Sequence, residues 1–322
     1  MERRTFLKSS TALLGTFSFA GMQPFSPLHP VPPADEEVVK IKIGAMQCTI
    51  FRDFLFKYQA KDFFINADPQ ELAQSLARYQ AASGTIPSPF IAVLLRHGDR
   101  NILIDSGVGF SEKPVTVRGT AQTVNGRLHP LLRQENVARE DITDVIITHF
   151  HPDHIGGLFS EAGEAHFPNA RFHAHGDEWQ YWHTSQSDGQ PAPFKQFIAR
   201  NITPLKGGNL NLVSGDFVEL LPGVTAVKAD GHTPGQIALA VGTGKERLLY
   251  ISDAFLHPLH VERTDWQTNY DLDHGKARQT RLKLLDLAHR ERMLVNAFHF
   301  DFPGLGRVGK RGNGWNWQPT AE

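Results

Sequence analysis

Histidine and aspartate residues follow four short apolar runs of the sequence, at the point where each run ends. The runs lead to the segment His149-Phe150-His151-Pro152-Asp153-His154, to His232, to Asp253 and to His299. Strand ends at one edge of a sheet lie close together even when they are far apart in the chain, so these side chains are expected to converge on one site. The composition agrees, because 16 histidines are an excess for 322 residues.

The first of these segments has the spacing of a metal site. Residues i and i+2 of an extended segment point the same way, so His149 and His151 can bind one ion. The turn after Pro152 then aims Asp153 and His154 at a neighbouring position. Imidazole and carboxylate ligands without thiolate suit zinc, and also manganese, iron or cobalt.

The pattern His149-x-His151-x-Asp153-His154, with His232, Asp253 and His299 in order downstream, resembles the metallo-β-lactamase superfamily. The resemblance covers about residue 38 to the C-terminus and implies a single α/β domain with an αβ/βα four-layer sandwich fold. It also implies a dinuclear site for two divalent ions, of which zinc is favoured. One ion would be held by His149, His151 and His232, the other by Asp153, His154 and His299, and Asp253 would bridge them.

Other short segments agree with this resemblance and indicate a branch of the superfamily. The strand end at Asp105-Ser106-Gly107 matches, with Asp105 expected to brace the site loops. The tail from His299 to Gly306 looks closest to methyl parathion hydrolases and related lactonases. Members with β-lactamase activity often carry a cysteine among the downstream ligands, whereas the single Cys48 precedes the motif. Antibiotic hydrolysis is therefore disfavoured.

The implied chemistry is hydrolysis by hydroxide. Two cations sharing a bridging water lower its pKa from 15.7 towards about 7, so that no serine or cysteine nucleophile is required. Asp253 would orient this nucleophile and is the predicted catalytic residue. We expect a small-molecule substrate, a lactone or carboxylic ester of the acyl-homoserine lactone type, with organophosphate triesters as an alternative.

Aromatic side chains between the ligand segments are candidates for the substrate pocket. Trp179, Trp182, Phe194 and Phe197 lie on helix-like segments, where aromatics also serve as core. The near-neutral charge and these aromatics favour a neutral substrate with an apolar tail. Trp179 is the first choice for a substrate contact.

Three other functions are compatible with parts of this pattern. A glyoxalase II-like thioester hydrolase would share the ligands but needs a basic cluster to bind the glutathione carboxylates. The segment from Arg307 to Arg311 is a weak candidate for that cluster. A mononuclear iron dioxygenase would not need His299. A non-enzymatic protein with a structural metal would close the coordination with protein ligands, whereas seven ligands shared by two ions leave positions open.

Four further histidines have ligand-like spacing but are not expected to bind metal. For His173 and His175 we expect a surface position or an indirect role behind the ligands. For His257 and His260 we expect solvated loop positions. Cys48 is interpreted as a small buried hydrophobic residue.

The elements that must position the site can be read from local patterns. Alternation from Val38 to Ile43 predicts a strand, and Asp68-Pro69-Gln70-Glu71 predicts a helix start that runs to about Gln80. A hairpin is expected around Gly98-Asp99. The expected strands before the ligands are Val145–Thr148, Val224–Ala229, Leu248–Ile251 and Met293–Ala297, and a helix is expected at His274–His289.

Composition excludes several classes of protein. With 33 basic and 34 acidic residues the net charge is -1, so nucleic acid is not an expected partner. The 40% apolar and 21% charged residues are typical of a globular protein. A single cysteine excludes an intrachain disulfide, and a homodimer is compatible with the sequence.

Residues 1–34 read as an export signal followed by a proline-rich spacer, and residues 35–322 as the hydrolase domain. Arg3-Arg4-Thr5-Phe6-Leu7-Lys8 resembles a twin-arginine signal, and the apolar stretch behind it is far shorter than the ~20 residues of a membrane span. We expect the twin-arginine export machinery as a partner, no stable membrane anchor, and a periplasmic or secreted protein.

Replacing the arginine pair tests this expectation. The double substitution Arg3→Lys, Arg4→Lys should leave uncleaved precursor in the cytoplasm, whereas the wild-type chain should be cleaved at a position between about residues 20 and 35. Cell fractionation and N-terminal sequencing in the native host measure both. Full-length wild-type protein in the cytoplasm would contradict the export hypothesis.

Overall fold

The computed structural model describes residues 36–79, 81–112, 115–117 and 120–320. In this part of the chain, no helix has the length and apolar character that crossing a membrane requires. The predicted export signal and spacer, residues 1–34, lie outside the described residues.

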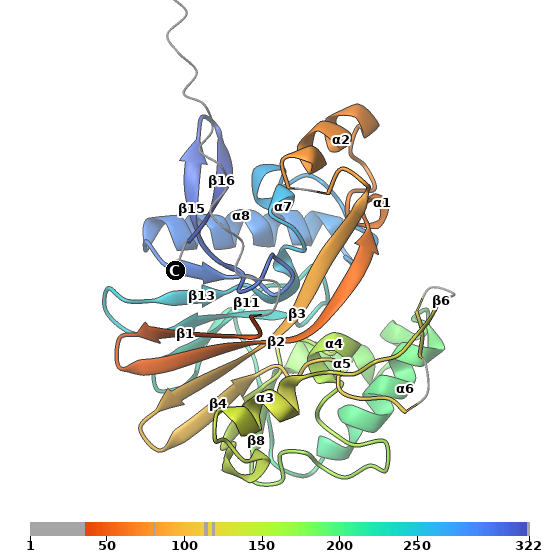
Figure 1. Ribbon diagram of the computed structural model, residues 1–322. Coiled ribbons are helices and arrows are strands. Elements are labelled where there is room, and N and C mark those ends of the chain that lie inside the picture. The colour runs from red at the N-terminus through yellow and green to blue at the C-terminus, as the bar shows by residue number, and fades with distance from the viewer. Residues whose placement is uncertain (1–35, 80, 113–114, 118–119, 321–322) are drawn as a thin grey trace, which may run out of the picture.

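Two seven-stranded mixed sheets make up the centre of the fold (Figure 1). The first sheet holds, in spatial order, β1 (Val38–Ile43), β2 (Met46–Gln59), β3 (Thr85–His97), β4 (Arg100–Ile104), β7 (Asp144–Ile146), β8 (Arg171–His175) and β9 (Leu210–Val213). The second holds β10 (Phe217–Leu221), β11 (Val224–Lys228), β12 (Ile237–Val241), β13 (Leu248–Tyr250), β14 (Leu294–Asn296), β15 (Leu305–Arg311) and β16 (Gly314–Pro319). A cluster of buried apolar side chains from both sheets, among them Ile50, Val93, Leu239 and Tyr250, forms the core between them.

Helices cover the outer face of each sheet. Those beside the first sheet are α3 (Leu128–Gln134), α4 (Pro152–Ile155), α5 (Gly176–Trp182) and α6 (Ala192–Asn201). The long helix α8 (His274–Arg290) packs on the second sheet through Leu284, Leu285 and Ala288. Three shorter helices share a separate apolar cluster: α1 (Ala60–Phe63), α2 (Pro69–Ala77) and α7 (Leu259–Glu262). The order of layers is helix, sheet, sheet, helix, which confirms the predicted αβ/βα sandwich.

Strand direction explains why distant residues meet. In the first sheet β4, β7 and β8 are parallel, so the segments after their carboxyl ends share one edge. In the second sheet β13 and β14 are parallel, and β11 runs the same way because both β11 and β13 are antiparallel to β12. The four ligand-bearing segments follow β7, β11, β13 and β14.

Most expected elements are present near their expected bounds. Asp68 caps α2 by accepting hydrogen bonds from the backbone N–H groups of Gln70 and Glu71, and α8 begins at His274. The expected hairpin is formed by β3 and β4. Cys48 is buried in β2, as interpreted. The full length of β2 and the hairpin of β15 and β16 were not predicted, because their sequences mix charged and apolar residues without a clear period.

Two glycines let the backbone beneath the ligand segment pack closely. A Cβ at Gly156 would lie 2.1 Å from the carbonyl oxygen of Val108, and one at Gly157 would lie 2.2 Å from that of Ser106. Contacts of this kind exclude any side chain. The segment after β4 is therefore held directly against the end of α4.

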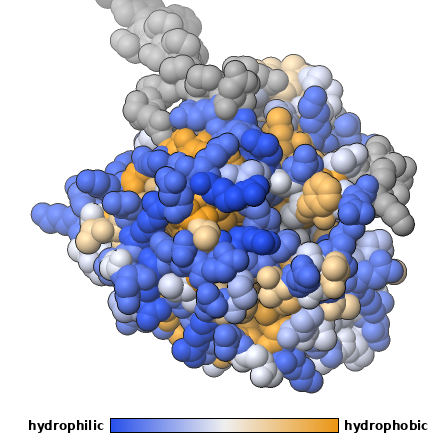
Figure 2. Space-filling model, turned by 60° about the horizontal axis from the view of Figure 1, so that its bottom comes forward, coloured by the Kyte–Doolittle hydropathy of each residue, from blue (hydrophilic) through white to orange (hydrophobic). Residues whose placement is uncertain are grey.

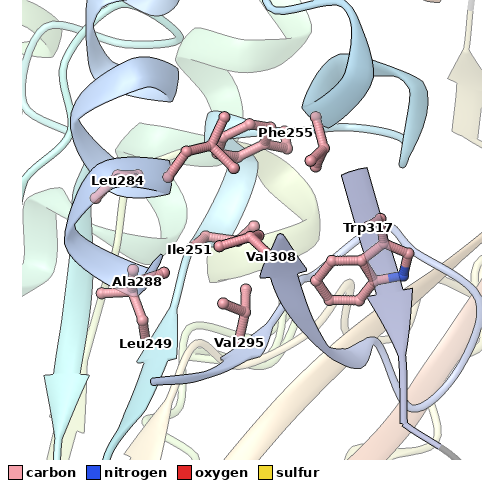
Figure 3. A pocket seen from close by; sticks show the side chains of 10 residues that line it. Leu249, Ile251, Phe255, Leu284, Ala288, Val295, Val308 and Trp317 are labelled. Carbon is pink, nitrogen blue, oxygen red and sulfur yellow. The ribbon is translucent and has the colours of Figure 1, made fainter. Parts of the chain in front are cut away.

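Hydrophilic side chains cover most of the face drawn in Figure 2, and apolar ones show in scattered patches. A small apolar space lies inside the second sheet's helical layer, between α8 and the strands (Figure 3). Leu249, Phe255, Leu284 and Trp317 are among its lining residues, which include no titratable side chain. This space belongs to the core and offers no group for chemistry.

Candidate metal centre

The structure brings all seven predicted ligand residues together at the shared strand edge. His149 and His151 follow β7, and Asp153 and His154 lie in α4. His232 lies between β11 and β12, Asp253 lies in the single-turn helix η4 (Ser252–Ala254), and His299 follows β14. They form two groups, and within each group the ligand atoms lie within 4.8 Å of one another. The first group is His149, His151, His232 and Asp253; the second is Asp153, His154, Asp253 and His299.

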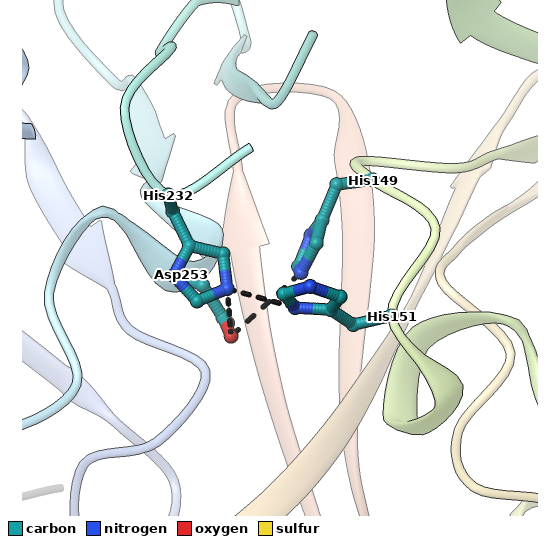
Figure 4. A group of neighbouring side chains, drawn as sticks. All are labelled: His149, His151, His232 and Asp253. Atoms are coloured by element: carbon teal, nitrogen blue, oxygen red, sulfur yellow. Dashed lines mark hydrogen bonds and ion pairs between the residues drawn. The ribbon is translucent and has the colours of Figure 1, made fainter. Parts of the chain in front are cut away.

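The first group surrounds one oxygen of Asp253 (Figure 4). His232 Nε2 lies 2.9 Å from His151 Nδ1 and 3.4 Å from Asp253 Oδ2. His149 Nε2 lies 3.8 Å from the same oxygen. Three imidazole nitrogens and a carboxylate thus face one small volume.

The second group also contacts Asp253, through both carboxylate oxygens. His299 Nε2 is 3.1 Å from Asp253 Oδ2, and His154 Nε2 is 3.2 Å from Asp253 Oδ1. Asp153 Oδ2 is 3.6 Å from His299 Nε2 and 3.8 Å from His154 Nε2. Asp253 is therefore the one side chain that both groups share.

These residues fit a pair of divalent cations. Three ligand atoms of these groups are buried and have no hydrogen-bond partner among the described residues: His149 Nε2, His154 Nε2 and Asp253 Oδ1. Buried polar atoms without partners are destabilising, and a bound cation would satisfy them. The donor set, imidazole nitrogen and carboxylate oxygen, is the one that zinc and related transition metals accept.

At His149, His151 and Asp253 the electrostatics favour the ligating forms. Burial and the neighbouring imidazoles lower the pKa values of His149 and His151 well below the usual histidine value, so both are neutral and keep a free lone pair. Burial raises the pKa of Asp253, but His299 and His154 outweigh it and hold this pKa well below its usual value. The shared carboxylate is therefore ionised.

Neighbouring hydroxyl and carboxyl groups hold the outer nitrogens of the imidazoles. Asp105, which has a positive φ of 58°, accepts hydrogen bonds from His154 Nδ1 at 2.8 Å, from the backbone N–H of Thr148 and from Tyr250 Oη. Ser88 Oγ lies 3.0 Å from His299 Nδ1. The prediction that Asp105 braces the site loops is confirmed. Such contacts fix which ring nitrogen is free to bind a metal.

Glu178 is a structural support that sequence reasoning missed. Its buried carboxylate accepts hydrogen bonds from the backbone N–H groups of Phe150 and Gly235, at 2.9 and 3.0 Å, and from Trp182 Nε1 at 2.7 Å. Glu178 therefore ties the segment that carries His149 and His151 to the segment that follows His232. An acidic residue in the first turn of a helix gives no sequence signal for such a role.

The four candidate pocket aromatics divide into two pairs. Trp182 and Phe194 have ring centroids 6.1 and 5.4 Å from that of His151. Trp179 instead stacks on His183, at 3.8 Å, and Phe197 faces the guanidinium of Arg200. Of the four, Trp182 and Phe194 are the ones that border the ligand group.

The four other histidines with ligand-like spacing lie outside the two ligand groups. His257 and His260 are buried, with 6% and 0% exposure, so the expectation of solvated loop positions was wrong. Both pack against Phe64, and His260 Nε2 donates to the carbonyl of Phe63. His173 and His175 are also buried rather than on the surface.

A comparison with protein families agrees with this geometry. The model of the metallo-beta-lactamase superfamily matches residues 92–295, which is more than half of the chain. The chain belongs to this superfamily.

Two curated relatives of this superfamily member are named hydrolases. The probable metallo-hydrolase Rv2300c of Mycobacterium tuberculosis is 25% identical over 244 residues, which cover 64% of this chain and 73% of the relative. The N-acyl homoserine lactonase AiiB of Agrobacterium fabrum is 30% identical over 190 residues, which cover 54% of this chain and 65% of the relative. Membership and these relatives confirm the predicted class of enzyme, a metal-dependent hydrolase.

Solved structures show the same fold. The structure of AidC, a dizinc quorum-quenching lactonase in complex with the product N-hexnoyl-L-homoserine, has a TM-score of 0.75 and 24% identity. The match covers 89% of this chain and 98% of AidC. The closer assignment to the methyl parathion hydrolase branch stays a prediction.

The two ligand groups predict about two ions per chain after metal supplementation, ~3.5 to 4 Å apart as in other two-metal centres. His299→Ala should reduce the content to about one ion, and Asp253→Ala should reduce both metal content and activity. Elemental analysis of purified protein measures the content. The matched control is His173→Ala, which removes a buried histidine bonded to Asp144 rather than to a ligand group and should keep two ions. A wild-type content of one ion or none would contradict the dinuclear site.

Proposed function

We propose that this enzyme hydrolyses lactones or carboxylic esters, with N-acyl homoserine lactones as the favoured class, at a centre of two divalent ions, zinc above all. The observation that carries the proposal is the sharing of Asp253 between two ligand groups at the sheet edge. The relative AiiB, named an N-acyl homoserine lactonase, supports the choice of substrate class.

Exposure of the site supports catalysis over a purely structural metal. His151 and Asp153 are half-buried, whereas His149, His154 and Asp253 are buried. Structural metal sites are closed by protein ligands, and catalytic ones keep an open position. The open side lies at His151 and Asp153, one from each group.

When bound, two divalent ions supply a water activated near neutral pH and a Lewis acid for the carbonyl oxygen. The chain's own contribution centres on Asp253. Its buried, ionised carboxylate would orient the attacking water and take up the released proton. As the oxygen of the water bonds to the carbonyl carbon, the ring C–O bond breaks and the proton passes to the departing oxygen. The product is a hydroxy acid.

The aromatic pair beside His151 would hold the apolar part of the substrate. Phe194 is half-buried on α6, and its ring is nearly parallel to that of Trp182, with 6.3 Å between centroids. Trp182 is buried and hydrogen-bonded to Glu178, so it supports the ring of Phe194 from the protein interior. Phe194 is therefore the side chain of the four that is best placed to contact an acyl chain.

A panel of substrates tests the proposed reaction. Metal-replete protein should open acyl-homoserine lactones with a higher kcat/KM than it shows for aryl esters, paraoxon-type triesters or lactoylglutathione. Lactone opening is measured by the release of protons into a weakly buffered solution. A clear preference for the triester or for the thioester would replace the lactonase proposal with one of those two activities.

Substitution of Phe194 tests the proposed contact between this ring and the acyl chain of the substrate. Phe194→Ala should cost on the order of 1 to 3 kcal/mol in kcat/KM for a long-chain lactone, because apolar contact with the chain is lost. The loss for a short-chain lactone should be smaller, and metal content should not change. Phe197→Ala, one turn further along α6, and Trp179→Ala are the matched controls. Equal losses for long and short chains in Phe194→Ala would show that this ring belongs to the core.

A further inference from the structure

A buried arginine on α8, Arg281, lies outside both ligand groups. The side chain of Arg281 is 1% exposed, and its guanidinium makes three hydrogen bonds. Nε donates to the carbonyl of Ala254 at 2.9 Å, Nη1 to the carbonyl of Trp266 at 2.7 Å, and Nη2 to Asp271 Oδ2 at 2.6 Å. Burying a guanidinium is unfavourable unless its hydrogen-bond partners are well placed, and these three acceptors supply such partners.

Asp271 connects this guanidinium to a predicted metal ligand. Its other oxygen, Oδ1, accepts a hydrogen bond from His232 Nδ1 at 3.1 Å, and both side chains are buried. A carboxylate oxygen can only accept in this pair, so the proton of the imidazole sits on Nδ1. The lone pair of His232 is then on Nε2, which faces His151 and Asp253.

The guanidinium also reaches the segment that carries the shared carboxylate. Ala254 directly follows Asp253, and Arg281 holds its carbonyl. The preceding residue, Ser252, has a positive φ of 46°, a conformation that is unfavourable for a residue with a side chain. Arg281 therefore helps to hold a turn that does not adopt its shape from local preference alone.

We propose that Arg281 and Asp271 are positioning residues that set the metal affinity of the group His149, His151, His232 and Asp253. This inference rests on the proposed metal centre. Asp271 fixes the ring of His232, and Arg281 fixes both Asp271 and the turn at Asp253. The fork of donors on one planar guanidinium is what allows a single residue to hold all three acceptors. The other ligand group has its own support, because His154 and His299 bond to Asp105 and Ser88.

Two variants of the full chain test the proposal by metal affinity rather than activity. Zinc is removed by chelation and added back against a competing chromophoric chelator, and cobalt is used in parallel for its visible spectrum. Asp271→Asn should weaken the binding of one ion by about 10- to 100-fold, as for other residues that orient metal ligands, and leave the second unchanged. Arg281→Lys keeps the charge but not the fork of donors. It should weaken the same ion, weaken the second ion to a smaller extent because Asp253 belongs to both groups, and alter the cobalt spectrum.

Asp144→Asn is the matched control. Asp144 is a buried carboxylate that accepts from His173 Nε2 at 3.0 Å and pairs with Arg100 at 2.9 Å, away from the ligand groups. This variant should lower the melting temperature without changing either zinc affinity. Wild-type zinc affinities and cobalt spectrum in a folded Asp271→Asn or Arg281→Lys variant would overturn the proposal. Two bound ions without lactone turnover in the wild type would contradict the proposed function and leave this inference standing.

Discussion

The carboxylate of Asp253 is the constraint on which the rest of the site depends. It is buried, it lies within 3.8 Å of imidazole nitrogens of His149, His154, His232 and His299, and it belongs to both ligand groups. A buried carboxylate needs compensating positive charge. His154 and His299 supply part of this charge, the neutral imidazoles of His149 and His151 supply none, and two divalent cations would supply more. This need for positive charge agrees with the convergence of imidazole and carboxylate ligands here.

The fold meets this demand through strand direction and close backbone packing. Parallel neighbours in each sheet send the ligand segments to a common edge, and Gly156 and Gly157 let the segment after β4 approach the end of α4. Buried acidic residues then fix the loops: Asp105 from the first sheet, Glu178 from α5 and Asp271 with Arg281 from the second half of the chain. Each of the three carboxylates accepts a hydrogen bond from a ligand side chain or from the backbone beside one. Rigid support of this kind is what a hydrolytic site requires.

The sequence predicts the ligand set because metal binding imposes residue type and spacing together, as in His149-x-His151-x-Asp153-His154. It predicts the strands before the ligands because these strands are short, mostly apolar runs. It does not predict Glu178, Asp271 or Arg281, whose roles depend on contacts between segments that are distant in the chain. It also misplaces His257 and His260. The local sequence does not distinguish a histidine in a solvated loop from one that packs against Phe64 in an apolar cluster. The branch of the superfamily and the substrate depend on pocket shape, which short motifs specify weakly.

Anomalous X-ray scattering at the zinc edge, from crystals of the metal-supplemented enzyme, would show whether two ions share Asp253. We expect two peaks ~3.5 to 4 Å apart, one bordered by His149, His151 and His232, the other by Asp153, His154 and His299, with the Asp253 carboxylate contacting both. A single peak, or two peaks of which only one touches Asp253, would contradict it.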